Sequence, residues 1–214
     1  MDPDRLLNLR ADYESEGLSR SDLTPEPFEL FVAWFSDALE SGLLEPHAFV
    51  LATAGGEARP SARTVLVREM DSRGIVFYTN YQSRKGAELA ANPRASAVFL
   101  WMPLHRQVRI EGRVEKVAAA QSDAYFSSRP PGSRLSAASS PQSETIPSRA
   151  WLEERTEELR RRYPDGDLPR PEEWGGYRLN PDYYEFWRGR PSRLHDRFEY
   201  RLRHGAWVTE RLAP

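Results

Sequence analysis

The chain of 214 residues contains no cysteine. This absence excludes disulfide bonds, thiolate catalysis and cysteine-ligated metal sites. Lysine is also scarce: of the 30 basic residues, Lys85 and Lys116 are the two lysines, and the remaining 28 are arginines. A bias of this kind follows from the base composition of a genome, so a single arginine does not by itself indicate a binding site.

Strong net charge and long apolar runs are missing too. The net charge of −2 and the sequence pI near 6.1 give no reason to expect a nucleic-acid or membrane-binding surface. The longest apolar runs, around residues 48–54 and 95–104, are far too short to span a bilayer. The first residues contain no continuous apolar segment of the signal-peptide type. We therefore expect a soluble, cytoplasmic protein without a nucleic-acid or membrane partner.

Several well-known motifs are absent. The sequence has no G-x-G-x-x-G, no Walker P-loop and no G-x-S-x-G, so classical dinucleotide, NTP and α/β-hydrolase sites have no support. The four histidines show no metal-ligand spacing, and we expect no metal site: they are His47, His105, His195 and His204.

What the sequence does contain is a helix followed by many short strands. We expect a flexible N-terminal segment over residues 1–20, with a polar helix at 4–15, and a single domain over 21–214. Thr24 and Pro25 predict a helix start, and apolar residues then recur at helical spacing up to Gly42. These core-facing residues are Phe28, Phe31, Trp34, Phe35, Ala38 and Leu39.

From residue 47 onward, short β-rich runs alternate with turns. We expect strands at 48–54, 64–69, 75–80, 96–102, 107–117, 177–181, 183–189, 197–203 and 206–212. Helices are expected at 118–128 and 149–163, and residues 129–148 read as a long irregular loop. Together these predict a mainly antiparallel sheet closed into a barrel, with helices packed outside, in the α+β class.

The stretch from Thr79 to Leu89 places two cations at a helix N-terminus. Ser83 is a suitable N-cap, and Arg84 and Lys85 follow in the first turn, where the helix dipole mildly repels positive charge. Either both side chains reach into water at a small cost, or an anion is bound there by free backbone N–H groups and by both cations. The residues alone favour the two interpretations about equally.

Two further groups of charged residues are candidates for a site. Arg63 and Arg68 flank a predicted strand, on opposite faces unless a bulge or a strand end intervenes. If residues 189–197 are extended, Arg193, His195 and Arg197 share one face, with Asp196 opposite. That face is either a site for an anionic substrate, with His195 able to transfer a proton, or the polar face of an edge strand.

Several blocks together resemble the pyridoxamine 5′-phosphate oxidase family, from about residue 10 to the C-terminus. They are "RTVLVRE", "FYTNYQSRKGAEL", "RQVRIEGRVEK", "AYFSSRP", "WGGYRL", "EFWRGRPSRLHDR" and "ERLAP". The resemblance implies a split β-barrel, a homodimer, and FMN at the subunit interface. It also favours the anion interpretation for Arg84 and Lys85, with the FMN phosphate as the anion.

The resemblance also implies a role for particular residues. Cofactor binding is expected at Arg63, Thr64, Val65, Leu66, Val67, Arg68, Tyr78, Thr79, Ser83, Arg84, Lys85, Gln107, Gln142, Ser143, Trp187 and Arg197. Of these, Gln142, Ser143, Trp187 and Arg197 are expected to come from the partner subunit. Substrate binding is expected at Arg10, Tyr13, Arg68, Tyr125, Arg129, Ser133, Arg193 and His195, and the last two are the candidate catalytic residues.

Two departures from the family pattern stand out. Arg68 occupies a position where the family usually has lysine, and arginine is longer and planar. The stretch "RLSAASSPQS" (134–143) differs from the commoner glutamine, isoleucine, glycine, alanine sequence and lacks a bulky residue at Ala138. We expect this second departure to change the loop near the flavin more than the activity.

The activity implied is oxidation of pyridoxamine or pyridoxine 5′-phosphate to pyridoxal 5′-phosphate. A hydride passes from the exocyclic carbon to FMN, water hydrolyses the imine formed from the amine, and O2 reoxidises the flavin to give hydrogen peroxide. The main alternatives are a related flavin oxidase of the phenazine-biosynthesis type and a non-catalytic flavin or pyridoxal-phosphate-binding protein. A split-barrel carrier of heme or deazaflavin is a further alternative.

Overall fold

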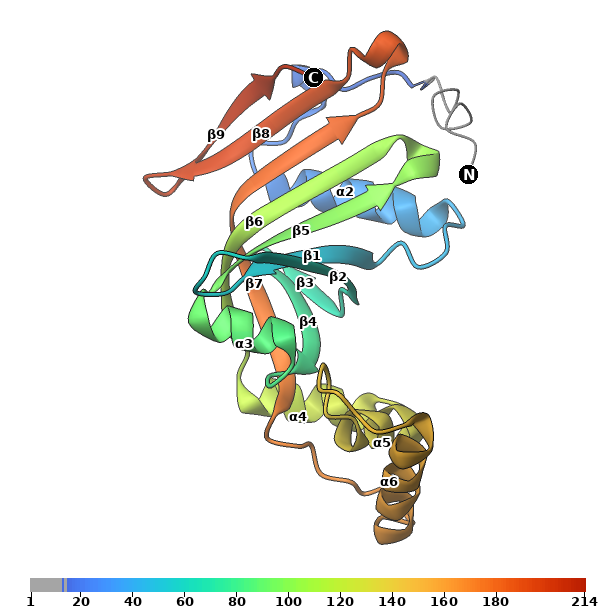
Figure 1. Cartoon of the computed structure of the whole chain (residues 1–214). Coiled ribbons are helices and arrows are strands. Elements are labelled where there is room, and N and C mark those ends of the chain that lie inside the picture. The colour runs from blue at the N-terminus through green and yellow to red at the C-terminus, as the bar shows by residue number, and fades with distance from the viewer. Residues whose placement is uncertain (1–12, 14) are drawn as a thin grey trace, which may run out of the picture. The chain divides into compact units, whose positions relative to one another are not determined.

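The computed structural model of the chain describes residue 13 and residues 15–214 (Figure 1). The chain divides into two compact units. Unit 1 contains the described residues up to Ala48 together with Val98–Ile110 and Asp182–Pro214. Unit 2 contains Phe49–Ala97 and Glu111–Pro181. The helix expected at 4–15 lies outside the described residues except for positions 13 and 15, which are not helical. The single domain expected over 21–214 stays a prediction.

Within the described part of the chain, nine strands form one sheet in the order β2-β1-β5-β6-β7-β4-β3, and β8 pairs with β7 and β9. The pairs β3/β4, β4/β7, β7/β8 and β8/β9 are antiparallel, as the strand pattern predicted. The strands are β1 Ala48–Ala54, β2 Pro60–Leu66, β3 Glu69–Asp71, β4 Gly74–Asn80, β5 Arg94–Trp101, β6 Arg106–Lys116, β7 Trp174–Arg188, β8 Asp196–Arg203 and β9 Ala206–Leu212.

The core of unit 1 forms around helix α2 (Pro27–Glu40), which begins two residues after the predicted Thr24–Pro25 start, with Pro27 in its first turn. Phe31 is fully buried and its ring lies 5.1 Å from that of Phe99. The predicted core face is largely correct. Leu39, which was predicted to face the core, is 54% exposed, and Leu30, which was not predicted, is buried. A short 3-10 turn, η1 (Arg20–Asp22), precedes the helix.

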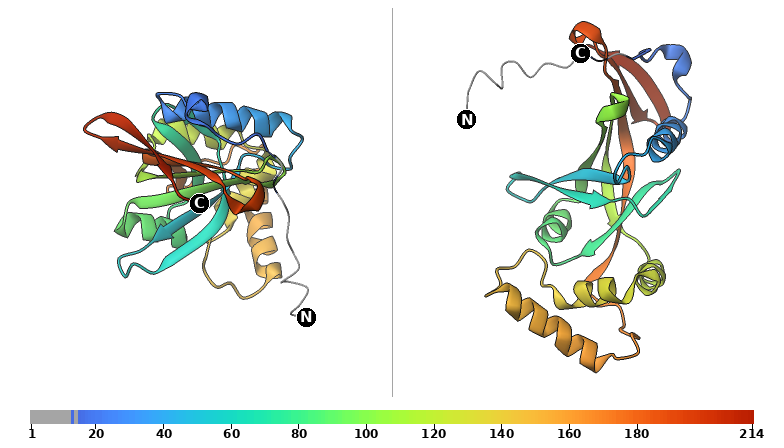
Figure 2. Two further views of the ribbon diagram at one scale, coloured as in Figure 1. Left: turned by 90° about the horizontal axis from the view of Figure 1, so that it is seen from above. Right: turned by 90° about the vertical axis from the view of Figure 1, so that its right-hand side faces the viewer.

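Strands β8 and β9 form a hairpin in unit 1, drawn in red in Figure 2. His204 and Gly205 make the turn with φ of 53° and 81°, the left-handed backbone that a two-residue hairpin needs. The sequence "HG" therefore correctly indicated the hairpin. Two more 3-10 turns in this unit are η2 (Met102–Leu104) and η3 (Pro191–Arg193).

In unit 2 the predicted strand over 64–69 is interrupted. Strand β2 ends at Leu66 and β3 begins at Glu69, so Val67 and Arg68 lie in a break between them. The backbone N–H of Arg68 donates to the carbonyl of Val76 on β4 over 2.9 Å. Because the strand ends here, the strict alternation that separated Arg63 from Arg68 no longer applies.

Helix α3 (Arg84–Ala91) follows β4 directly, and its N-cap is Ser83, as predicted, because the Ser83 side chain accepts from the Gly86 N–H. Gly86 packs closely on the preceding chain. A Cβ at this position would lie 2.0 Å from the carbonyl oxygen of Tyr81. Only glycine therefore lets the first turn of α3 approach the end of β4 this closely.

Three helices complete unit 2: α4 (Ala119–Ser128), α5 (Pro131–Ser139) and α6 (Arg149–Arg162). The prediction of an irregular loop over 129–148 was wrong for its first half, which is α5. Pro131 occupies the first helical turn, where proline is favoured, so the Pro- and Ser-rich composition concealed a helix start. Helix α5 packs against α6, and the hydroxyl of Thr156 bonds that of Ser139 over 2.9 Å.

The two strands expected at 177–181 and 183–189 are one continuous strand, β7. Its residues up to Leu179 pair with β4, and those from Tyr183 pair with β8. Pro181 lies between these two segments and pairs with neither β4 nor β8. No helix among the described residues is long and apolar enough to span a membrane.

Candidate functional site

A cavity of about 1010 Å³ lies in unit 2, and every residue that lines it belongs to that unit. The lining includes the residues assigned to the cofactor at Arg63, Thr64, Val65, Leu66, Arg68, Tyr78, Thr79, Arg84, Lys85, Gln142 and Ser143. It also includes three further residues assigned to the substrate, Tyr125, Arg129 and Ser133. Residues far apart in the sequence and chosen for binding thus surround one space.

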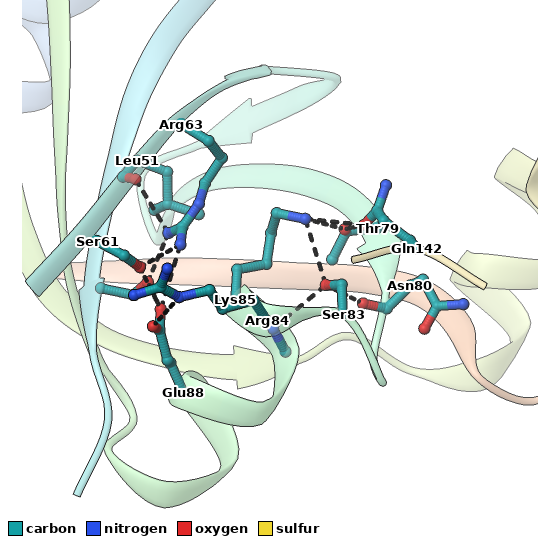
Figure 3. A network of polar contacts seen from close by, with 12 residues as sticks. Leu51, Ser61, Arg63, Thr79, Asn80, Ser83, Arg84, Lys85, Glu88 and Gln142 are labelled. Carbon is teal, nitrogen blue, oxygen red and sulfur yellow. Dashed lines mark hydrogen bonds and ion pairs between the residues drawn. The ribbon is translucent and has the colours of Figure 1, made fainter. Parts of the chain in front are cut away.

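Lys85 is the most deeply buried cation of the cavity wall, with 7% of its surface exposed. Its ammonium donates to Gln142 Oε1 (2.8 Å), Thr79 Oγ1 (3.1 Å) and Ser83 Oγ (3.3 Å), as Figure 3 shows. Burial, and then the charge of Arg63, lower the pKa of Lys85 to about 8. We expected Gln142 to come from a partner subunit, yet the Gln142 of this chain already reaches Lys85.

Glu88 connects the other two cations of this wall (Figure 3). Its Oε1 accepts from Arg84 Nε over 2.9 Å, and its Oε2 accepts from Arg63 Nη2 over 3.2 Å. The hydroxyls of Thr53 and Ser61 also donate to Oε2, each over 2.6 Å. Burial raises the pKa of Glu88, but these hydrogen bonds outweigh it and bring the pKa to about 2, so the carboxylate is ionised.

An aromatic wall closes another part of the cavity. The rings of Tyr78 and Tyr125 stack with centroids 3.8 Å apart, and Trp174 lies nearly parallel to Tyr78 at 5.6 Å. The guanidinium of Arg129 lies 4.8 Å from the centre of the Trp174 ring, a cation–π contact. Arg129 Nη1 is buried and has no hydrogen-bond partner within the described part of the chain.

The other assigned residues are in unit 1, where His195 lies among aromatic rings. Tyr13 makes edge contacts with His105 (5.0 Å), Trp187 (5.8 Å) and His195 (5.5 Å). His195 Nδ1 accepts from the backbone N–H of Arg190 over 3.1 Å, so the neutral ring carries its proton on Nε2. Burial, and then the charge of Arg193, lower the pKa of His195.

Short contacts from residues after Tyr13 fix the same region of unit 1. Ser15 Oγ donates to the Gly189 carbonyl over 2.5 Å, and the Leu18 N–H donates to Asp196 Oδ2 over 3.0 Å. Arg10, the other N-terminal residue assigned to the substrate, lies outside the described residues.

Arg197 belongs to a second carboxylate-centred cluster of unit 1. Its Nε donates to Glu185 Oε1 over 2.7 Å, and Arg109 Nη2 lies 2.9 Å from Glu185 Oε2. Glu185 is 4% exposed, and hydrogen bonding to it raises the pKa of Arg197 further. Gln107, assigned to the cofactor, lies on the neighbouring β6 segment of this unit.

Residues 189–197 are not one extended segment, so the condition under which Arg193, His195 and Arg197 would share a face is not met. Pro191–Arg193 form the turn η3, and Ser192 and Arg193 have φ of 58° and 63°. Strand β8 begins only at Asp196, so Arg193 does not share a strand face with His195 and Arg197. Two consecutive non-glycine residues in the left-handed region mark a strained turn, a feature that clusters at functional sites.

Glu88 and Trp174 are among the residues of the cavity region that sequence reasoning missed. Glu88 was detectable in principle, because it lies four residues after Arg84 on a predicted helix, the spacing of an intrahelical ion pair. Trp174 gave no such signal, because it precedes "GG" at a strand start and reaches Tyr78 and Arg129 only through the tertiary fold. Val67 and Ser83 are assigned residues that sit beside the cavity-lining ones, and Ser83 acts through Lys85.

Across residue 13 and residues 15–214, no group of three or more His, Asp or Glu side chains is arranged to hold a metal ion.

Comparison with known proteins identifies similar families and sequences. Residues 35–163 match the family described as pyridoxamine 5′-phosphate oxidase, and residues 174–214 match the pyridoxine 5′-phosphate oxidase C-terminal dimerisation region. The pyridoxine/pyridoxamine 5′-phosphate oxidase of a Cyanothece species is 53% identical over 98% of both chains. The protein of the same name from Burkholderia multivorans is 54% identical over 98% of this chain and 99% of its own.

Solved structures show the same fold. PhzG from Burkholderia lata, in complex with tetrahydrophenazine-1-carboxylic acid, is 31% identical, with a TM-score of 0.89 over 95% of this chain and 100% of its own. A pyridoxamine 5′-phosphate oxidase-related, FMN-binding protein from Nostoc punctiforme is 17% identical, with a TM-score of 0.70 over 90% and 100% of the two chains. The similarity to the Nostoc punctiforme protein supports the fold alone. Together the two structures confirm the predicted split-barrel class.

Proposed function

Because the chain belongs to the pyridoxamine 5′-phosphate oxidase family, we propose that it is an FMN-dependent oxidase of pyridoxamine and pyridoxine 5′-phosphate. The product is pyridoxal 5′-phosphate, with O2 reduced to hydrogen peroxide. The observation that carries the proposal is a single cavity lined by two groups of cations, Arg63, Arg84 and Lys85 in one and Arg68 and Arg129 in the other. Cofactor and substrate each bring a phosphate monoester, so two cationic groups match two dianions.

The residues present fit FMN. Lys85, Arg84 and the Ser83 cap lie at the start of a helix of eight residues, where backbone N–H groups and the dipole favour a phosphate. The hydroxyls of Thr79 and Ser83 accept from the Lys85 ammonium and hold this cation beside the start of the helix. FMN, when bound, supplies the two-electron redox chemistry, and the chain supplies placement and electrostatics.

On the substrate side, the proposal assigns the second phosphate to Arg129 and Arg68. Arg129 offers a buried N–H donor that no described group uses, held in place by Trp174. Arg68 is exposed at the break between β2 and β3, and both arginines line the cavity. Arginine can bind a phosphate through two parallel hydrogen bonds, so Arg68 is able to replace the lysine usual in the family.

The proposal assigns orientation and proton handling at the pyridine end to Arg193 and His195. With Nδ1 occupied by the Arg190 N–H, the atom of His195 that exchanges a proton is Nε2. The lowered pKa keeps this imidazole neutral near neutral pH, so Nε2–H acts as a hydrogen-bond donor without adding a positive charge.

A homodimer is part of the proposal. It is supported by the match of residues 174–214 to a dimerisation region, and those residues include Trp187 and Arg197. Light scattering that gives a stable monomer with tightly bound FMN would contradict this arrangement. The cytoplasmic location expected from the sequence stays a prediction.

The test is aerobic incubation of the purified protein with pyridoxamine 5′-phosphate and with pyridoxine 5′-phosphate, following aldehyde and hydrogen peroxide. We expect a yellow protein that releases about one FMN per subunit on denaturation and forms both products in equal amounts. A folded protein that takes up no FMN would overturn the proposal.

An oxidase of the phenazine-biosynthesis type is the second candidate, because of the fold shared with PhzG. The higher identity to pyridoxine/pyridoxamine 5′-phosphate oxidases and the cations Arg68 and Arg129 favour a phosphorylated pyridine. Turnover of a reduced phenazine carboxylate, with no turnover of either phosphate ester, would favour the second candidate.

A further inference from the structure

We propose that Glu88 is a positioning residue for the cofactor phosphate, because it fixes the guanidinium groups of Arg63 and Arg84 at the cavity wall. The inference rests on the proposed function, since it assigns a task to a carboxylate within the expected phosphate site. Glu88 itself is an anion and does not bind the phosphate. It acts through the two arginines.

The Glu88 side chain joins three elements of unit 2. Thr53 is on β1, Ser61 and Arg63 are on β2, and Glu88 and Arg84 are on α3. The carboxylate accepts from all four of these side chains, and its own side chain is only 12% exposed. An isolated surface pair at i,i+4 contributes little, but a largely buried carboxylate with four donors holds its partners in one geometry.

The two arginines use different N–H donors for Glu88 and differ in the donors that remain. Arg84 donates to Glu88 through Nε. Its terminal Nη groups, with four N–H donors, make no hydrogen bond within the part of the chain that the structure describes. Arg63 uses both Nη groups, for Leu51 O, Thr53 Oγ1, Ser61 Oγ and Glu88 Oε2, which leaves Nε–H. Arg84 therefore has both Nη groups free to bind an anion. Arg63 mainly holds Glu88 in place and contributes positive charge.

Glu88 also changes the net charge of the site. Arg63, Arg84 and Lys85 carry three positive charges around one wall, and Arg63 already lowers the pKa of Lys85. Glu88 reduces the sum to two, close to the charge of about −1.5 to −2 on a phosphate monoester. Glu88 thus limits repulsion among the cations while the arginines stay in place.

Glu88→Gln tests the inference, because positioning and plain charge predict opposite results. If Glu88 only reduced the local positive charge, its neutralisation would tighten the binding of FMN. If it positions the arginines, FMN binding weakens by roughly tenfold, the loss of about one charged hydrogen bond. The measurement is titration of the full-length protein, freed of flavin, with FMN and in parallel with riboflavin, which lacks the phosphate.

A merely structural role would weaken both flavins alike, so the expected signature is a loss for FMN with riboflavin changed by less than about twofold. The matched control is Glu153→Gln. Glu153 accepts from Arg149 Nε over 2.7 Å in the same i,i+4 spacing, but on the exposed surface of α6, and we expect no change there. Unchanged or tighter FMN binding in Glu88→Gln, or equal losses for both flavins, would overturn the inference.

A double-mutant cycle with Arg84→Gln shows whether Glu88 acts through Arg84. We expect Glu88→Gln to weaken FMN binding much less in the Arg84→Gln background than alone. Additive losses would overturn the coupling. If Glu88→Gln does not fold, Ser61→Ala removes one hydrogen bond to the carboxylate and is expected to weaken FMN binding by about threefold, again without affecting riboflavin. A wild-type protein that binds neither flavin would refute the proposed function itself.

Discussion

The cavity of unit 2 and the His195 region of unit 1 differ in the charge that their titratable groups carry. Around the cavity, cations outnumber carboxylates, and buried Lys85 contacts only neutral oxygens. Around His195 the ring is held by Tyr13, Trp187 and one backbone N–H, and its neutral form is favoured. The first arrangement is suited to binding a fixed negative charge, and the second to orienting an uncharged donor or acceptor.

The same contrast holds for the carboxylates. Glu88 forms ion pairs with two arginines that line the cavity. Glu185 pairs with Arg197 and Arg109 and is buried beside Tyr183. In the cavity, positive charge remains after this pairing, because Glu88 offsets only one of its two arginines. Lys85, Arg68 and Arg129 carry further positive charge. Affinity for an anion should therefore depend on unit 2, and turnover should depend on the orientation of groups in unit 1.

Removing the excess charge should produce the largest effect. We expect the double variant Arg84→Ala/Lys85→Ala to bind FMN more weakly by on the order of several hundredfold, because each charged hydrogen bond contributes about 1.5–3 kcal/mol. Excess FMN should partly restore activity. The measurement is FMN titration with steady-state kinetics at two FMN concentrations.

The matched control is Arg161→Ala/Arg162→Ala, which removes two adjacent, exposed cations at the end of α6. FMN affinity should not change in this control. A double variant of residues 84 and 85 that stays fully yellow would show that the phosphate is held elsewhere.

Disturbing orientation in unit 1 should have the next largest effect. His195→Asn and Arg193→Ala should remain yellow but lose on the order of a hundredfold in kcat/KM, the usual consequence of misplacing reacting atoms by about 1 Å. Added FMN should not rescue them. His204→Asn is the control, because His204 is exposed in a turn where asparagine tolerates its positive φ. Loss of flavin in the His195 or Arg193 variants would reverse our assignment of the two regions.

Arg68 tests the substrate side of the cavity with a smaller effect. Arg68→Met should raise KM roughly tenfold, as expected for one charged hydrogen bond to the substrate phosphate, while Arg68→Lys should stay active. FMN affinity should change little in either variant, because Arg84 and Lys85 remain. Unchanged KM values in Arg68→Met would place the substrate phosphate outside the reach of Arg68.

Changing the pH should alter FMN affinity through Lys85 and kcat/KM through His195, each by severalfold and in a different pH range. Lys85 has a pKa of about 8 in the folded protein, compared with 10.5 ordinarily, so it loses its charge as the pH rises above about 8. FMN affinity should then fall with increasing pH. The free protein should instead become more stable between those two values, because the unfolded chain then holds more protons than the folded one.

The comparison variant is Lys85→Arg, whose guanidinium stays charged, so FMN affinity should no longer fall in this range. His195 has a lowered pKa, so its protonation should reduce kcat/KM only toward acidic pH. An FMN affinity that is independent of pH up to about 9.5 in the wild type would contradict the role given to Lys85.

Local signals in the sequence predicted much of the fold. The strand at 48–54, the alternating burial of 107–117, the Ser83 cap and the "HG" hairpin follow from side-chain periodicity and turn chemistry. Helix α5 was missed because its Pro- and Ser-rich sequence is also typical of loops. The turn at Arg193 was missed because nothing local requires a positive φ there.

The site, like the fold, was predictable only where a local motif in the sequence indicated it. Family motifs indicated the cations around the cavity, because they lie within distinctive blocks. The cluster around Glu88 joins residues 53, 61, 63, 84 and 88, and a carboxylate with four donors becomes visible only once β1, β2 and α3 are assembled. Trp174 likewise contacts Arg129 only through the packing of unit 2.

The close approach at Gly86 limits how such a site can diverge during evolution or in the laboratory. Any side chain at position 86 would collide with the Tyr81 carbonyl, so α3 cannot be shifted or rotated without remodelling the end of β4. Changes in phosphate binding at this helix should therefore come from exchanging Arg84, Lys85 and Glu88, which leaves the close approach at Gly86 intact. Libraries that vary these three positions and keep Gly86 should yield folded proteins far more often than libraries that vary all four.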